Sequence, residues 1–157
     1  MRRITAETVI QASAQRVWDL YADVPGSAEW VPFVEHVLWV DGPAGVGQAY
    51  AERTRLLGMA DEAEWRVVEW DPPRRQVQRS DGKGMTSHLI IEVQPMGDAG
   101  ARVRQTVTLE SRLPWPLAWY HEALFGLVGG YGIRSAVRGA RRHLEEGSSG
   151  ARGEGKA

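Results

Sequence analysis

The chain is expected to form one α+β domain in which a seven-stranded antiparallel sheet wraps around a long C-terminal helix. Seven segments are predicted as strands, and the first and the last of them alternate apolar and polar residues with a period of two, which is typical of strands with one buried face. Two short helical segments lie between the first and second of these strands, and a long helical stretch follows the last. At 157 residues, with 43% hydrophobic residues, the chain has the size and composition of a single domain that buries its own core.

Near the N-terminus, apolar and polar side chains alternate over residues 4–10, which predicts the first strand. Ser13 is a suitable N-cap for a helix over residues 14–21. Residues 27–30 are expected to form a second short helical or turn segment. Pro32 ends that segment, because proline lacks the backbone amide and restricts the residue before it.

The middle of the chain is expected to supply the other six strands, separated by turns that contain aspartate, glycine and proline. In the last of them Val103, Val107 and Leu109 share one face, and Gln105 is a polar residue on the same apolar side. These strands are predicted at residues 34–40, 48–57, 62–70, 75–80, 85–94 and 101–111.

A long helix is predicted from Leu117 to about Glu146, and its apolar face changes partway along. The change falls at Gly129, Gly130 and Gly132, and each glycine costs a helix up to about 1 kcal/mol relative to alanine. A kink, or a break into two helices, is therefore expected there. The early apolar positions are 117, 120, 124, 127, 128 and 131, and the later ones are 133, 137, 140 and 144.

If this helix continues through its glycines, the sheet-facing side lacks side chains at Gly126 and Gly130, which would leave room over the sheet. The early apolar positions lie beside Trp115 and Trp119. A loop, a ligand or a partner is expected to cover them, since a large exposed apolar patch is unusual. The segment 115–127 is therefore a candidate contact with a second copy of the chain or with a carrier protein.

Composition and motifs exclude several classes of function. The formal net charge is −1, from 19 basic and 20 acidic residues, so nothing in the overall charge attracts nucleic acid. There are no cysteines, which removes thiolate nucleophiles and cysteine-ligated zinc. Nucleophile-elbow, phosphate-loop and paired-histidine motifs are absent as well. We therefore expect no metal, no cofactor and no nucleic-acid partner.

The two ends of the chain carry little structure of their own. The N-terminus lacks the apolar run of a signal peptide, and no stretch of 18 apolar residues suggests a membrane span, so a cytoplasmic location is expected. Residues 147–157 are rich in glycine and polar side chains and are expected to form a disordered tail. This leaves residues 1–146 as one domain.

Four segments together carry a resemblance to a known family. They are residues 12–18 (ASAQRVW), residues 30–32 (WVP), residues 69–75 (EWDPPRR) and the turn over residues 95–102. In this order the sequence resembles the START-like (helix-grip) superfamily, particularly its polyketide cyclase/dehydrase branch. The resemblance implies a deep cavity between the sheet and the long helix, which relatives use to carry lipids or quinones, or to cyclise and dehydrate polyketide chains.

Three residues are candidates for proton transfer in such a cavity: His121, Glu52 and Tyr50. His121 shares a helical face with Leu124 and Val128, which would place an imidazole beside an apolar chamber. It could equally be a histidine satisfied in the core or at an interface. Glu52 and Tyr50 share one face of their strand, and the sequence leaves open whether that face points inward.

The expected ligand-binding residues come from strands and from the long helix. Both faces of the strand at 62–70 carry an indole, so the orientation of Trp65 stays open. Arg79 and Gln105 are expected to orient a ligand carbonyl, although Arg79 could instead form a solvent-exposed charge pair. For His88 the solvent side is the simpler location. The set comprises Trp65, Arg79, His88, Gln105, Trp119, Tyr120, Leu124, Val128 and Tyr131.

The predicted function is binding of a hydrophobic small molecule by a polyketide cyclase/dehydratase-like enzyme that works without metal or nucleotide. The alternative is a non-catalytic carrier of a lipid, a quinone or a polyaromatic product. A protein-interaction module is a third reading, but it leaves the helix glycines unexplained.

Overall fold

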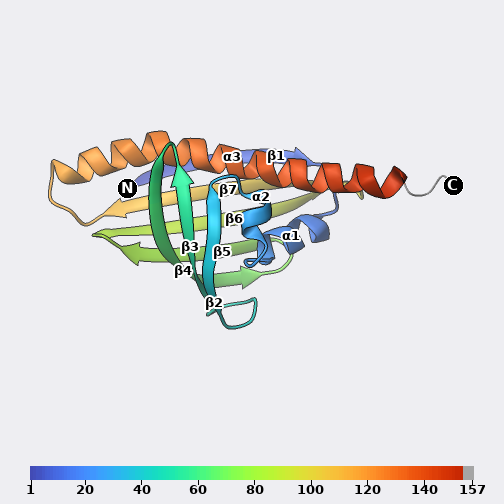
Figure 1. Ribbon diagram of the computed structural model, residues 1–157, viewed down its shortest axis with the longest axis horizontal. Helices are drawn as coiled ribbons and strands as arrows, with labels where there is room; N and C mark the ends of the chain where they lie inside the picture. Colours follow the sequence, from blue (N-terminus) through green and yellow to red (C-terminus); the bar gives the residue numbers. More distant parts are fainter. Residues whose placement is uncertain (154–157) are drawn as a thin grey trace.

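The computed structural model describes the backbone of residues 1–153 and the side chains of residues 1–147, and it has one curved sheet with a long helix lying along it (Figure 1). The predicted α+β fold is confirmed, with two short helices before the second strand. The elements in chain order are β1 Arg2–Ile10, α1 Ala14–Ala22, α2 Ser27–Trp30, β2 Val34–Asp41, β3 Ala49–Leu56, β4 Met59–Asp71, β5 Arg75–Gly82, β6 Met85–Met96, β7 Gly100–Ser111 and α3 Leu117–Gly153.

The sheet is antiparallel throughout, with the strand order β1-β7-β6-β5-β4-β3-β2. In Figure 1, β2, β3 and β4 run across the direction of the other strands, so the sheet curls around the helix. Two of its hairpins turn through two residues each, Leu57-Gly58 and Lys83-Gly84, and all four residues have positive φ. Such turns match the right-handed twist of the flanking strands.

The main hydrophobic core lies where α1 and α2 meet one end of the sheet. The Ser13 side chain caps α1 as expected, because its oxygen accepts a hydrogen bond from the Arg16 amide at 3.2 Å. Trp18 of α1 meets Trp70 of β4 edge to face, with ring centroids 5.0 Å apart. Buried residues of α3, including Ala140, complete this cluster, so the second half of α3 is firmly held.

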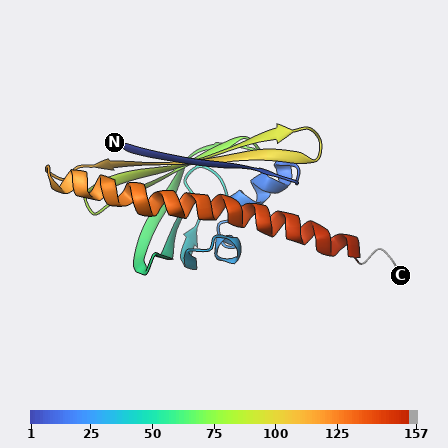
Figure 2. The ribbon, with the colours of Figure 1, turned by 90° about the horizontal axis from the view of Figure 1, so that it is seen from above.

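The helix α3 is continuous through its glycines, so of the two expected alternatives the division into two helices is excluded. One side of α3 faces the sheet along the whole contact. Phe125, Gly129, Ile133 and Val137 lie on this side, because they follow one another at intervals of about one turn. The early apolar stripe is therefore not a second packing face. Figure 2 shows α3 running beside β1 for most of the strand's length.

The glycines of α3 leave room for neighbouring side chains to pack against the helix backbone. A Cβ atom at Gly126 would lie 2.7 Å from the Arg2 guanidinium, and one at Gly129 would lie 3.3 Å from Ile4. At Gly130 the nearest atoms belong to Arg134 of the same helix. At Gly126 and Gly129 the bare helix surface thus lets side chains of β1 approach closely.

The helix also continues to Gly153, whereas the sequence indicated a tail without structure from residue 147. No proline interrupts this stretch, so helical backbone hydrogen bonding can continue. Residues 154–157, the rest of the predicted tail, lie outside the described residues. Within the described part of the chain, no helix is long and apolar enough to span a membrane.

Replacing Gly139 with alanine should destabilise the fold. The new Cβ would overlap the carbonyl oxygen of Trp30 and lie 3.1 Å from the Pro32 ring, and a backbone atom cannot move aside as a side chain can. We expect a loss of about 1–3 kcal/mol in the free energy of unfolding, measured by urea denaturation. Gly147→Ala in the same helix is the control, because nothing lies within 4 Å of its Cβ position. Equal effects of the two substitutions would contradict this packing.

Candidate functional site

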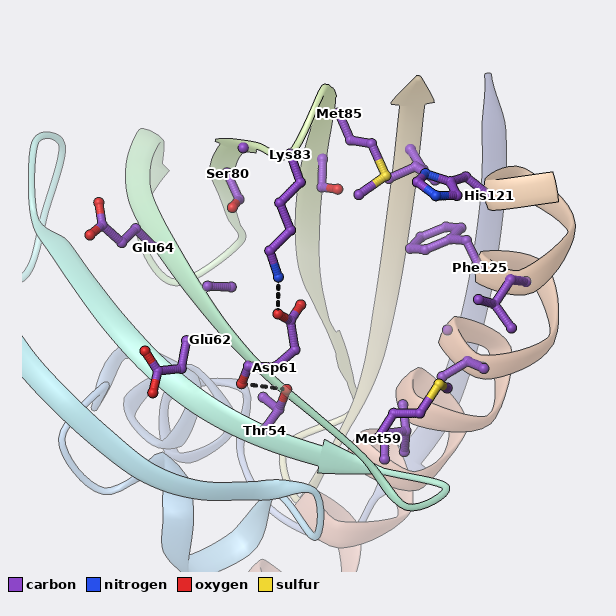
Figure 3. A pocket seen from close by; sticks show the side chains of 18 of the residues that line it. Thr54, Met59, Asp61, Glu62, Glu64, Ser80, Lys83, Met85, His121 and Phe125 are labelled. Carbon is purple, nitrogen blue, oxygen red and sulfur yellow. Dashed lines mark hydrogen bonds and ion pairs between the residues drawn. The ribbon is translucent and has the colours of Figure 1, made fainter. Parts of the chain in front are cut away.

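A pocket of about 630 Å³ opens between the first half of α3 and the sheet, at the end away from α1 (Figure 3). Its walls come from the β3–β4 hairpin, from the β5–β6 turn and from α3. Ser80 and Ser87, which lie opposite each other on β5 and β6, supply hydroxyl groups to its lining. The apolar lining residues are Leu56, Met59, Ala60, Ala63, Trp65, Met85, Leu109, Leu124, Phe125 and Val128.

Strand register determines which face of β3 and β4 points toward the pocket. Tyr50 pairs with Trp65, and Glu52 pairs with Ala63, so these four residues share one face of the sheet. Trp65 and Ala63 line the pocket. The inward orientation of Glu52 and Tyr50, which the sequence left open, follows from this alternation.

Arg79 and His88 lie on the outer face of the sheet and do not line the pocket. They are directly opposite each other on β5 and β6, while the neighbouring residue Gln78 is buried on the inner face. The Arg79 guanidinium instead pairs with Asp81, with Nε 2.7 Å from a carboxylate oxygen. A strand residue and its neighbour point to opposite faces, so an inward Gln78 turns Arg79 outward.

The helix residues divide in the same way. Leu124 and Val128 line the pocket as expected, together with His121. Trp119, Tyr120 and Tyr131 are turned away from the pocket, with exposed fractions of 66%, 58% and 46%. Leu124 is itself 36% exposed, so it lies at the border between the pocket side of the helix and the exposed side that carries Tyr120 and Tyr131.

His121 places an imidazole in the wall of the pocket that α3 forms (Figure 3). Its Nδ1 atom is buried and has no hydrogen-bond partner among the described residues. The Trp65 Nε1 atom, in the strand wall of the pocket, is likewise buried and without a partner. A buried polar atom left unpaired costs about 1–3 kcal/mol, so both atoms are suited to bind something in the pocket.

Glu52 is a largely buried titratable group of the inner face; it lies opposite the lining residue Ala63 and is not itself among the lining residues. Burial raises the pKa of its carboxyl group to about 7. The Trp65 indole N–H approaches the carboxyl and opposes part of this shift, although it does not form a hydrogen bond of standard geometry. A carboxyl group with a pKa near neutrality can both take up and release a proton at physiological pH.

Tyr50 and Gln105 belong to hydrogen-bonded networks outside the pocket lining. The Tyr50 hydroxyl donates to Gln78 Oε1, and Gln78 Nε2 donates to Gln76 Oε1 at 3.0 Å. Burial, and next the charge of Glu52, raise the pKa of Tyr50 well above its ordinary value. Tyr50 therefore keeps its proton, which removes it as a general base.

A second hydrogen bond joins α1 to β7: the Tyr21 hydroxyl donates to Gln105 Oε1 at 3.3 Å, and both residues are buried. Sequence reasoning missed Gln76 and Gln78. Their spacing of two in a short strand was the signal that could have revealed them. These buried amides lie deeper in the domain than the pocket residues.

The fold and the pocket define a small-molecule-binding protein of the helix-grip class. The chain belongs to the family described as polyketide cyclase / dehydrase and lipid transport, whose model matches residues 1–146. That family supports binding of a hydrophobic ligand. Within the described residues, no group of three or more His, Cys, Asp or Glu side chains could hold a metal ion.

Several known proteins are similar over nearly the whole chain. An uncharacterized protein of Mycobacterium tuberculosis is 28% identical over 150 residues, which are 93% of this chain and 96% of the relative. The Zhui aromatase/cyclase from a Streptomyces species has a TM-score of 0.80 at 16% identity, over 92% of this chain and 93% of that one. The protein TTHA0849 from Thermus thermophilus has a TM-score of 0.78 at 22% identity, over 93% and 99%. These two structures establish the fold.

Replacing Glu52 with glutamine should change how stability depends on pH. Because the pKa of Glu52 is raised on folding, the native state holds this proton more tightly than the unfolded state, and stability falls as pH rises from about 4.5 to about 7. The variant should lack this fall, which amounts to up to about 3 kcal/mol in the free energy of unfolding.

Urea denaturation of both proteins at a series of pH values measures the difference. Glu146→Gln, at an exposed residue of α3, is the control and should keep the wild-type profile. Parallel pH profiles for wild type and Glu52→Gln would show that Glu52 is not protonated near neutral pH.

Proposed function

We propose that this protein binds a hydrophobic molecule that carries a carbonyl or hydroxyl oxygen, and that it catalyses cyclisation or dehydration of that molecule without a cofactor. The observation that carries the proposal is one largely apolar pocket whose helix wall holds the unpartnered buried atom His121 Nδ1 and whose strand wall holds the Trp65 indole beside Glu52. A mostly apolar site with a few placed polar groups binds and orients such a ligand.

Glu52 supplies the proton transfer in this proposal. Its carboxylate removes a proton from the carbon next to a ligand carbonyl, and a His121 N–H stabilises the resulting enolate oxygen. The enolate carbon then forms a bond with a second carbonyl carbon of the same ligand, and the Glu52 carboxyl returns its proton to the new alkoxide. Dehydration removes a second proton from the same carbon, and the hydroxyl group leaves as water with the proton that Glu52 holds.

Three observations favour the enzyme over a passive container. Burial tunes the Glu52 pKa to about 7, where a proton-transfer group works best at neutral pH. His121 lies in the wall of the pocket that α3 forms. The similar Zhui protein is an aromatase/cyclase. The alternative is a carrier of a lipid, a quinone or a polyaromatic product, and the family description, which includes lipid transport, favours it to the same degree as catalysis.

Filling the pocket from the helix should abolish ligand binding. Val128→Trp places an indole among the lining residues, whereas Leu127→Trp adds the same side chain at a position that is 70% exposed and outside the lining. With the neutral fluorescent probe N-phenyl-1-naphthylamine, we expect at least about a tenfold loss of affinity for the first variant and less than about a twofold change for the second. Thermal melting checks that both fold. Equal probe affinity in the two variants would place the bound probe elsewhere.

Proton abstraction from a simple ketone separates enzyme from carrier. The aromatic ketone 2-tetralone in deuterated water should exchange its α-protons at least about tenfold faster with the protein than in buffer, measured by NMR. Glu52→Gln should remove the acceleration, and His121→Phe should reduce it, while each variant still binds the ketone. No acceleration by a wild-type protein that binds 2-tetralone would favour the carrier.

A further inference from the structure

The lysine that lines the pocket forms an ion pair with an aspartate of the same lining. Lys83, in the β5–β6 turn, is the only lysine or arginine among the described residues that line the pocket. Its ammonium group forms an ion pair with Asp61 of β4. Figure 3 shows the two side chains extending toward each other across the strand wall of the pocket.

The other acidic residues of the lining direct their carboxylates elsewhere. Glu62 and Glu64 pair in register with Arg53 and Ala51, on the face of the sheet opposite to Trp65, and Figure 3 shows both pointing away from the helix wall. The Asp81 carboxylate forms an ion pair with Arg79, whose side chain lies on the outer face of the sheet. Asp61 is thus the carboxylate that pairs with Lys83, and the pair lies at the open rim of the pocket, where the two side chains are 54% and 66% exposed.

An anionic ligand would find no compensating charge in this pocket. Its head group would lose water against apolar side chains, and moving an unpaired charge out of water is costly. The polar groups that remain are the uncharged hydroxyls of Thr54, Ser80 and Ser87, the Trp65 indole and His121. Glu52, on the same inner face, would repel an anion whenever its carboxyl is ionised.

We propose that Asp61 is a specificity-determining residue, which neutralises Lys83 so that the pocket takes uncharged oxygen-bearing ligands and rejects those with a carboxylate or sulfonate, free fatty acids included. This inference rests on the proposed function, since it concerns what the same pocket binds. Asp61 acts by occupying the lysine and takes no part in the proton transfer assigned to Glu52.

A pair of fluorescent probes that differ by one charged group tests the proposal. N-phenyl-1-naphthylamine is neutral, and 8-anilinonaphthalene-1-sulfonate has the same ring system with a sulfonate added. The wild-type protein should bind the neutral probe at least about tenfold more tightly in low salt. Asp61→Asn frees Lys83, and we expect it to raise the sulfonate's affinity about three- to tenfold while leaving the neutral probe within about twofold.

Two further variants make the test specific. Adding Lys83→Met to Asp61→Asn should remove the gain, because the freed cation is lost. Glu7→Gln makes the same charge change on the outer face, where it frees Arg104 from an ion pair of 3.0 Å, and should not alter the preference between the probes. Thermal melting confirms that each variant is folded.

The outcomes separate this inference from the proposed function. If the wild-type protein does not bind the neutral probe, the pocket does not bind small apolar molecules and the proposed function fails. If it binds the neutral probe, but Asp61→Asn leaves the sulfonate's relative affinity unchanged, the role of Asp61 is overturned while ligand binding stands. Equal wild-type affinity for the two probes would likewise overturn the selection against anions.

Discussion

The packing of the second half of α3 against the short helices and the sheet positions both walls of the pocket. Ala136 and Ala140 pack in the main core, and Gly139 lets the helix backbone approach the Trp30 carbonyl. With this half held, the first half of α3 projects over the other end of the sheet. There Gly126 and Gly129 bring β1 close to the helix, while the β3–β4 hairpin curls away and leaves the pocket between them.

Polar side chains divide the inner face of the sheet into a core half and a site half. In the core half, buried glutamines bond with tyrosines: Gln78 accepts from Tyr50, and Gln105 accepts from Tyr21. A buried amide that is paired in this way costs little, and the network specifies one arrangement of the core. Gln76 Nε2 stays unpaired within this network, and in the site half the nitrogen atoms of Trp65 and His121 stay unpaired beside a cavity. Sites that bind ligands tolerate such a cost because the ligand offsets it.

The first half of α3 carries its remaining apolar side chains on the outside. Leu127 is 70% exposed, and Trp115, just before the helix, is 82% exposed, so neither a loop nor another part of the described chain covers them. Leu124 belongs both to this exposed surface and to the lining of the pocket. The predicted contact of this segment with a second copy or with a carrier protein stays a prediction. Its position would let a partner influence entry to the pocket, because the two surfaces meet at Leu124.

The sequence alone determined the class of fold, the element order and the approximate bounds of most strands and helices. These properties depend on local periodicity and on turn and cap residues such as Ser13 and Pro32, which act over a few positions. It also supplied the residues from which the site is built, with His121, Glu52 and Trp65 among them. Alternation within one strand could show that Glu52 and Tyr50 share a face, but not which face the helix would cover.

Tertiary structure decided the rest, since orientation depends on pairing between distant segments. The register of β3 against β4 turned Glu52 and Trp65 inward, and the register of β5 against β6 turned Arg79 and His88 outward. The continuity of α3 was equally a tertiary outcome, because contacts with β1 offset the low helix propensity of its glycines. Nothing in the sequence spacing of Lys83 and Asp61 predicts that they form an ion pair. Only the folded sheet brings those two charges together.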